Sequence, residues 1–291
     1  MSQPAYPLCI GNFALDQIVR PHGYEVTPGG AALRVSLAWA LFGQPIRLIT
    51  AIGNEPIWEA VLALLQQNHV DTTEVVRAAH SLQFCTTFDA DGAIVDFQAA
   101  HEEVTTLILD RATTPRLAQV PLVHICPFAW DVQIALAQRA AQAGATVSSM
   151  IHFSSLTATD HAMYRSRLPL FDLLFLNEAE AQTLVGHAAD WKQCGQQLSS
   201  LVRRYVFLTC AERGAAVFAG GDLIATVPAA HLTVRDILGA GDCFAGGALA
   251  GLALTDDPQV ALRYGAITAA FALADIGHQA LARFLTLECQ L

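Results

Sequence analysis

The sequence is poor in charged residues and has almost no lysine. Asp, Glu, Lys and Arg together make up 14% of the 291 residues, and Lys192 is the single lysine. Its neighbours Trp191, Leu198 and Leu201 indicate a surface helix, so a mechanism that needs a catalytic lysine is not expected. The formal net charge of −10 disfavours a nucleic-acid partner, because nucleic acid attracts basic surfaces.

Paired cysteines and long apolar runs are also missing. The seven cysteines contain no Cys-x-x-Cys pair and no zinc spacing, and several lie in apolar runs. This pattern predicts buried free thiols in a reducing cytosol. Neither a signal peptide nor an apolar stretch of about 18 residues is present, so we expect a cytoplasmic protein without a membrane partner.

What the chain does contain is a regular alternation of apolar strands and helical segments. Apolar residues reach 53%, enough for a large core. Strands are expected, for example, at residues 46–50, 122–126 and 173–176, and glycine-containing turns at 89–92 and 220–221 indicate two hairpins. Alternation of this kind predicts an α/β fold of three layers, a mostly parallel sheet between helices. Without a repeat or linker, residues 1–291 are expected to form one domain.

The most informative segment is 236–247, DILGAGDCFAGG, where a loop becomes a helix. Gly239, Ala240 and Gly241 leave their backbone N–H groups accessible at a helix N-terminus, which favours an anion such as a phosphoryl group in transfer. Asp242 follows directly, where a carboxylate can take the proton of an attacking hydroxyl. The alternative is a tight loop in which Asp242 only caps the helix. Neither G-x-G-x-x-G nor G-x-x-x-x-G-K-[ST] matches the segment.

Two further segments carry polar groups at turns. Gly29 and Gly30 precede the helix expected at 31–42, and Asp16 upstream is a candidate for binding the vicinal hydroxyls of a polyol. A plain glycine turn and a loop aspartate are the alternative. Asn177 and Glu180 follow a strand, where ligands bind in open α/β sheets, and they suit magnesium and phosphate. They suit a capping box equally well.

Four segments, in this order, resemble motifs of the ribokinase-like, or pfkB, family of carbohydrate kinases. They are 28–36 (PGGAALRVS, similar to P-G-G-A-x-x-N-x-A), 177–180 (NEAE, N-x-x-E), 209–214 (TCAERG, T-x-G-x-x-G) and 236–242 (DILGAGD, D-T-x-G-A-G-D). The resemblance extends from about Leu8 to Gly277, nearly the whole chain. The last motif is the most specific of the four.

The resemblance implies a role for each matched segment. It implies ATP and Mg²⁺ as cofactors, with Asp242 as the base and Gly239–Gly241 as the anion hole. The acceptor side is formed by Asp16, Gly29, Gly30 and Arg34. The nucleotide side is formed by Asn177, Glu180, Thr209, Gly214, Gly277 and His278, of which Asn177 and Glu180 handle magnesium, and Asp236 lies at a monovalent-cation site.

This sequence departs from the family at three places. Arg34 stands where the family usually has an acceptor-binding asparagine, so it either recognises an anionic acceptor or turns away and serves the structure. Ile237 and Leu238 replace hydroxyl residues, which weakens the monovalent-cation assignment. Ala211 replaces a glycine of the nucleotide segment.

A fourth departure concerns the lid over the active site. Eleven residues lie between Asp16 and Pro28, where ribokinase has lid strands, and this short connection resembles inositol-kinase-like members of the family. We therefore expect a reduced or absent lid, with the hairpin at 84–97 as its remainder. Such a site would exclude water poorly. A homodimer in which the second subunit covers the site is compatible with this expectation.

Three functions follow from these observations. The main one is a kinase that phosphorylates a hydroxyl of a sugar or polyol. The first alternative is a nucleoside kinase of the same family, for which Phe13 and Tyr24 are candidates for an aromatic wall near Asp16. The second is a member of the family that binds a ligand without turnover, suggested by the changes at Arg34, Ile237 and Leu238.

Overall fold

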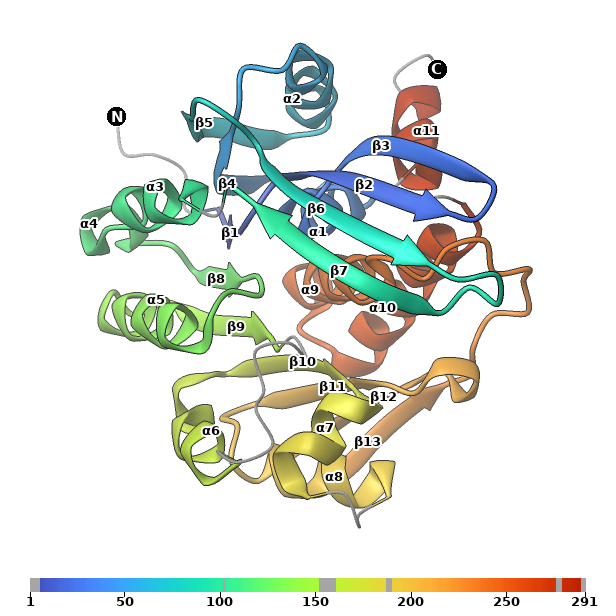
Figure 1. Ribbon diagram of the computed structural model, residues 1–291. Coiled ribbons are helices and arrows are strands. Elements are labelled where there is room, and N and C mark those ends of the chain that lie inside the picture. The colour runs from blue at the N-terminus through green and yellow to red at the C-terminus, as the bar shows by residue number, and fades with distance from the viewer. Residues whose placement is uncertain (1–5, 102, 152–160, 187–189, 276–278, 289–291) are drawn as a thin grey trace.

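The computed structural model describes residues 6–101, 103–151, 161–186, 190–275 and 279–288, which form two β-sheets and the helices around them (Figure 1). The main sheet has nine strands in the order β13-β12-β11-β10-β9-β8-β1-β4-β5. These strands are β1 (Leu8–Ile10), β4 (Ile46–Ile52), β5 (Val70–Arg77), β8 (Leu122–Ile125), β9 (Thr146–Met150), β10 (Leu173–Asn177), β11 (Tyr205–Thr209), β12 (Ala215–Ala219) and β13 (Asp222–Val227). All pairs are parallel except β11–β12 and β12–β13.

Helices cover both faces of this sheet, because its central strands are apolar on both sides. One face packs against α1 (Ala31–Ala40), α2 (Ile57–Gln67), α9 (Ala240–Thr255), α10 (Pro258–Leu273) and α11 (Gln279–Glu288). The other packs against α3 (Val104–Arg111), α4 (Thr114–Leu117), α5 (Trp130–Gln142), α6 (His161–Arg167), α7 (Glu178–Val185) and α8 (Trp191–Ser199). Two apolar cores result, and β1 contributes Leu8 and Ile10 to one and Cys9 to the other. The expected three-layer α/β fold is confirmed.

The strand order reverses at the centre of the sheet. From β1 the chain moves outward to β4 and β5, and after β8 it moves outward on the other side to β13. The crevice between the carboxyl ends of β1 and β8 is therefore the place where an open α/β sheet binds ligands. Gly11, just after β1, lies so close to Cys126, just after β8, that a Cβ on Gly11 would lie 2.5 Å from the Cβ of Cys126.

A second sheet, here called the lid sheet, has four strands in the order β3-β2-β6-β7. They are β2 (Ala14–Arg20), β3 (Gly23–Gly29), β6 (Leu82–Phe88) and β7 (Ile94–Ala100). The hairpin around residues 89–92 was expected, but its interpretation as all that remains of the lid was wrong. The short connection from Asp16 to Pro28 is itself a hairpin, closed by a turn at Pro21 and His22, and β2 pairs with β6 in parallel.

Close packing between helices positions the start of α9. A Cβ on Gly246 would collide with the backbone carbonyl of Val35 in α1, and one on Gly247 would collide with Thr268 in α10. Thr268 Oγ1 donates a hydrogen bond of 2.6 Å to the carbonyl oxygen of Cys243. The two glycines therefore let α9 lie directly against α1 and α10, with its N-terminus at the crevice.

Most of the expected elements are present, and three strands that were missed share a cause. The surface helix around Lys192 and the hairpin at 220–221 are confirmed. β2, β3 and β5 were not expected, because they mix polar and apolar residues without a strong period of two. Among the described residues, no helix is long and apolar enough to cross a membrane.

Burial of His124 makes the stability of the fold depend on pH. The ring of His124, in β8, is fully buried and its Nδ1 lies 2.9 Å from Ser148 Oγ. Burial lowers the pKa of His124 to about 3. Below about pH 6.5, His124 therefore takes up a proton in the unfolded chain but stays neutral in the folded protein. The free energy of unfolding thus falls as the pH falls towards 3.

We expect His124→Asn to remove this component. Between pH 7 and pH 5 the wild type should lose about 2 kcal/mol more unfolding free energy than the variant. Urea unfolding of both proteins at the two pH values measures the difference. His231→Asn, at an exposed position, is the control and should follow the wild type. Equal losses in the wild type and His124→Asn would contradict the prediction.

Candidate functional site

Three charged side chains from three elements meet at the crevice. Arg34, in the first turn of α1, donates from Nη2 to Asp16 Oδ2 of the lid strand β2. Its Nη1 lies 3.5 Å from Oδ2 of Asp242, in the first turn of α9. All three side chains are at most 13% exposed. The structure therefore joins the predicted acceptor residue to the predicted base, and Arg34 points into the site.

Glycines leave the space in which these side chains meet. A Cβ on Gly29 would overlap the carboxylate of Asp16, and one on Gly239 would overlap the side chain of Arg34. Gly30 has a φ of 91° and lies against the backbone carbonyl of Asn12. A side chain there would both collide with that carbonyl and force an unfavourable backbone conformation. The paired glycines of the sequence thus admit a close approach of neighbouring protein atoms, whereas the predicted approach to a ligand stays a prediction.

Two opposing effects shift the pKa values in the site: burial disfavours a charged side chain, and pairing with an opposite charge favours it. Burial raises the pKa of Asp16 above its ordinary value, although Arg34 acts in the opposite direction. Burial alone would lower the pKa of Arg34, but Asp16 and Asp242 outweigh it and raise that pKa. Burial also raises the pKa of Cys243 to about 12. Arg34 therefore stays charged and Cys243 stays a neutral thiol at physiological pH.

The N-terminus of α9 offers backbone donors beside this cluster. Gly239 is the residue before the helix and has a left-handed φ of 76°, which glycine adopts without strain. The N–H groups of the first turn of a helix lack intrahelical acceptors and carry partial positive charge. A Cβ added to Gly241 would lie 3.8 Å from the terminal methyl carbon of Met150, at the end of β9. The turn thus lies over the carboxyl ends of the central strands.

Asn177 and Glu180 form the capping box that was one of their two interpretations. Asn177 Oδ1 accepts a bond from the backbone N–H of Glu180 at 2.9 Å, and Glu180 Oε2 accepts one from Asn177 N–H at 2.8 Å. Asn177 also pairs in register with Thr209 of the neighbouring strand. A phosphate or magnesium role for these residues stays a prediction, and the cap fixes where their oxygens lie.

The predicted nucleotide segment continues from Thr209. Gly214 has a φ of 90° and lies against the backbone carbonyl of Val227. Ala211 adopts a left-handed φ of 47°, a conformation that costs energy for alanine and suits the glycine it replaces. Arg213 makes an ion pair with Glu178, which ties this segment to the start of α7. Gly277 and His278 lie outside the described residues.

Asp236 is buried and accepts the backbone N–H of Leu238 at 3.0 Å. The guanidinium of Arg20, at the end of the lid strand β2, lies 3.6 Å from its Oδ1. A monovalent cation at Asp236 would share this carboxylate with Arg20. Within the described part of the chain, no group of three or more His, Cys, Asp and Glu side chains is arranged to hold a metal ion.

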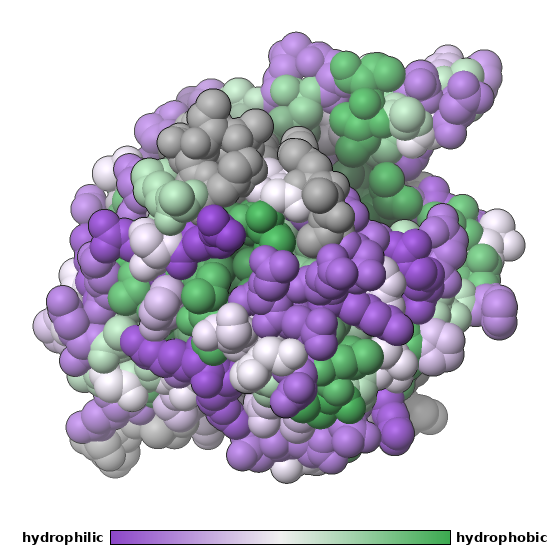
Figure 2. All heavy atoms as spheres, turned by 90° about the horizontal axis from the view of Figure 1, so that it is seen from below, coloured by the Kyte–Doolittle hydropathy of each residue, from purple (hydrophilic) through white to green (hydrophobic). Residues whose placement is uncertain are grey.

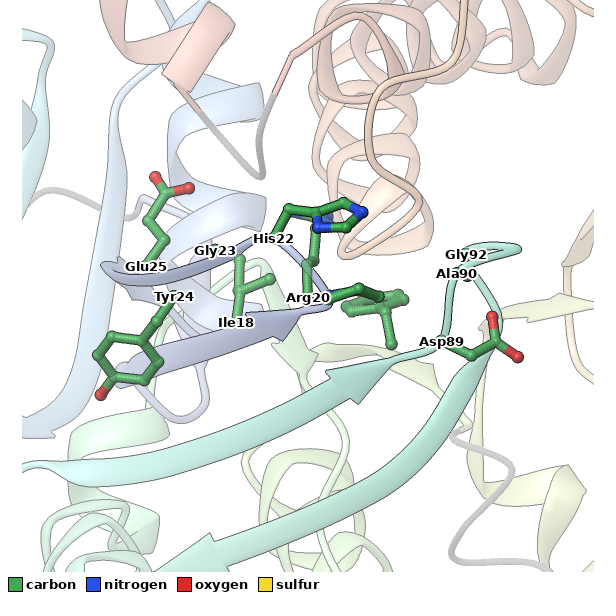
Figure 3. Close-up of a pocket in the computed structure, with 11 residues that line it drawn as sticks. Ile18, Arg20, His22, Gly23, Tyr24, Glu25, Asp89, Ala90 and Gly92 are labelled. Atoms are coloured by element: carbon green, nitrogen blue, oxygen red, sulfur yellow. The ribbon is translucent and has the colours of Figure 1, made fainter.

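Figure 3 shows a cavity of about 470 Å³ between the tips of the two lid hairpins, lined among others by Ile18, Arg20 and Phe88. Tyr24 and Glu25 point to opposite sides of β3 in this view. Glu25 accepts a hydrogen bond of 3.1 Å from Gln279 of α11, so its side of the lid faces the main sheet and Tyr24 lies on the outer side.

Neither aromatic residue named from the sequence forms a wall beside Asp16. Phe13 is fully buried against Trp58, with ring centroids 5.7 Å apart, and Tyr24 is 63% exposed on the outer side of the lid. Both expectations were wrong, because Phe13 belongs to the apolar core and the register of the lid strands places Tyr24 on the outer side. Two rings of the inner side, Phe84 and Phe97, have centroids 5.4 Å apart.

Register places these rings beside Asp16. Phe84 of β6 pairs with Asp16 of β2, and Phe97 of β7 pairs with Thr86 of β6, two residues further along. Paired residues project from the same side of a sheet, and neighbouring strands lie about 4.8 Å apart. Phe97 is 52% exposed. In Figure 2 the lid projects at the upper right and carries a band of hydrophobic side chains.

Comparison with known proteins shows the family of the chain. Residues 9–283 match the family model described as pfkB family carbohydrate kinase. A cytidine kinase of Thermococcus kodakarensis is 25% identical over 255 residues, 83% of this chain and 86% of the relative.

Two solved structures share the fold. The adenosine kinase of Sinorhizobium meliloti superposes with a TM-score of 0.81 at 18% identity, covering 98% of this chain and 99% of that one. The fructokinase of Xylella fastidiosa with bound ATP gives a TM-score of 0.77 at 22% identity, covering 99% of both chains. None of these three relatives is named as an inositol kinase, so the narrower resemblance has no support. The chain belongs to the pfkB family of carbohydrate kinases, ATP-dependent enzymes that transfer a phosphoryl group to an alcohol.

Proposed function

We propose that the protein transfers the γ-phosphoryl group of ATP to a hydroxyl of a nucleoside. The observation that carries the proposal is the inner side of the lid sheet. Asp16 lies on that side, where it pairs with Arg34 and faces Asp242. Phe84, in the neighbouring strand β6, pairs in register with Asp16, and its ring lies beside that of Phe97. A carboxylate beside an aromatic surface suits an acceptor with hydroxyls at one end and a planar base at the other.

In this reaction Asp242 is the base. An acceptor hydroxyl held by Asp16 gives its proton to the carboxylate of Asp242 while its oxygen forms a bond to the γ-phosphorus. The bond from that phosphorus to the oxygen bridging it to the β-phosphate breaks, and ADP leaves. The proton, the phosphoryl group and the leaving group are thus all accounted for.

The N-terminus of α9 stabilises the charge that develops on the phosphoryl oxygens. The backbone N–H groups of Gly239–Gly241 lie at the positive end of the helix, beside Asp242. They are fixed before the reaction by the packing of Gly246 and Gly247 against α1 and α10. Preorganised donors of this kind need no rearrangement when the charge appears.

The nucleotide lies on the other side of this turn, over β10 and β11. Asn177 and Glu180 supply one amide and one carboxylate, and both use an oxygen in the capping box. Such a set fits a Mg²⁺ that keeps its waters and binds mainly to nucleotide phosphates. The ion, when bound, neutralises phosphate charge. Thr209, at the end of β11, and Gly214, just before β12, flank the nucleotide.

The kinetic role of Asp242 is tested by Asp242→Asn. With Mg-ATP and a panel of nucleosides, sugars and polyols, we expect the wild type to release ADP best with a nucleoside. The variant should lose at least 100-fold in kcat, because general-base catalysis contributes about 10²–10⁴. ATP binding, measured by calorimetry, should change little.

Asp256→Asn is the matched control, since Asp256 lies at the opposite, exposed end of α9. It should keep full activity. A sugar or polyol as the best acceptor would contradict the nucleoside assignment and leave the kinase. Absence of transfer across the panel, with ATP bound, would indicate a member of the family that binds without turnover.

The aromatic pair is tested by Phe97→Ala. Loss of stacking should raise the KM for a nucleoside about 5- to 100-fold, since stacking of a base on an aromatic ring contributes about 1–3 kcal/mol. The KM for free ribose, which has no base, should stay the same. Tyr24→Ala removes an exposed ring from the outer side of the same sheet and should change neither value. An equal KM for the nucleoside in Phe97→Ala and wild type would refute the stacking role.

The two roles of Asn177 are separated by two substitutions. Asn177→Ala removes the cap and should lower the unfolding free energy by about 1 kcal/mol, whereas Asn177→Ser keeps an N-cap oxygen and should lower it much less. Both should raise the KM for Mg-ATP two- to tenfold if the amide also serves the nucleotide. An unchanged KM in Asn177→Ser would leave Asn177 as a cap alone.

A further inference from the structure

We propose that Arg34 is a positioning residue that links Asp16, which holds the acceptor, to the base Asp242, and that the cluster of these three side chains favours acceptors without negative charge near the reacting hydroxyl. The inference rests on the proposed function for the identity of base and acceptor. Its physical basis is the arrangement of the three side chains, which belong to the lid, α1 and α9.

The guanidinium is held from several sides. Its two terminal nitrogens face one carboxylate each, Asp16 and Asp242. Its stem and Nε lie against the α-carbon of Gly239, in the space that a side chain there would occupy. Arg34 is 8% exposed, and its Nε has no hydrogen-bond partner among the described residues. A side chain packed in this way fixes the orientation of the carboxylates that it contacts.

Charge balance argues against an anionic acceptor. The cluster holds two carboxylates and one guanidinium, so its sum is −1 before any substrate binds, and Asp236 lies close enough to Asp16 to raise its pKa. A carboxylate or phosphate on the acceptor would add negative charge to a buried cluster whose cation is already shared. A neutral acceptor adds none. The site therefore favours the hydroxyls of an uncharged molecule.

The same arrangement places a positive charge beside the base. Among the described groups that face Asp242 are Asp16 from β2, Arg34 from α1, Cys126 after β8 and Cys243 from α9. Burial raises the pKa of both thiols, which stay neutral, so Arg34 is the positive charge among these four. Without it, Asp242 would take up a proton more readily beside Asp16.

Arg34→Gln and Arg34→Lys test the proposal by the pH dependence of kcat/KM. In Arg34→Gln the acid limb should move to higher pH by about one unit or more, because an opposite charge at this distance lowers the pKa of a carboxyl by about 1–3 units. kcat should fall at least tenfold, and the KM for Mg-ATP should change less than twofold. Arg34→Lys should restore the acid limb and part of kcat, since it keeps the charge without the planar fork.

Arg204→Gln is the matched control, because Arg204 pairs with Asp256 at the far end of α9. It should keep the wild-type profile. Neutral nucleosides and nucleoside monophosphates are compared as acceptors in each protein. A wild type that prefers the monophosphate, with this preference lost in Arg34→Gln, would overturn the proposal and assign Arg34 to an anion.

A second measurement does not depend on turnover. The side-chain carboxyl of Asp242 is titrated by ¹³C NMR in protein labelled at aspartate, with Asp242→Asn identifying the signal. Its midpoint should lie at higher pH in Arg34→Gln than in the wild type and in Arg204→Gln. The same midpoint in all three proteins would overturn the positioning role. Failure of the proposed function would instead leave this shift intact while no acceptor is phosphorylated.

Discussion

The close contact between α1 and α9 is the constraint on which the site depends. The carbonyl of Val35 approaches α9 at Gly246, where any side chain would collide with it. Because Arg34 directly precedes Val35, this contact brings its guanidinium to Asp242 at the start of α9. Gly247 and Thr268 hold the opposite side of α9 in the same way. Small residues thus set the distance between helices, and that distance sets the geometry of the charges.

Two ion pairs connect the lid to α1 and to the loop before α9; the lid supplies the acidic residue of one pair and the basic residue of the other. Asp16 of β2 pairs with Arg34, and Arg20, four residues further along the same strand, pairs with Asp236. Asp16 and Arg20 project from the same side of β2, since side chains alternate along a strand. The Asp16–Arg34 pair is buried, whereas Arg20 is partly exposed above the buried Asp236. Both pairs favour the observed position of the lid over the crevice, because an unpaired charge on Asp16, Arg34 or Asp236 would be costly.

Much of this arrangement was predictable because local rules and global fold agree. Apolar strands alternating with helices predicted the layers, and the glycine-rich segment at 239–241 predicted the loop-to-helix turn at the start of α9. The lid was harder to predict. Its strands carry polar residues on both sides, because one side faces an open crevice, so hydrophobic periodicity did not reveal β2 and β3. The same ambiguity led to Phe13 and Tyr24 instead of Phe84 and Phe97.

The sequence by itself determined the fold and the family, since these depend on local patterns and short motifs, and it named the residues that we propose carry the chemistry. It left open whether Arg34 turns into the site, whether Asn177 caps a helix, and which aromatic rings lie near Asp16. Those answers depend on strand register and on the distance between helices far apart in the chain. Only the tertiary structure decided them, because a shift of one residue in register moves a side chain to the opposite face of its sheet.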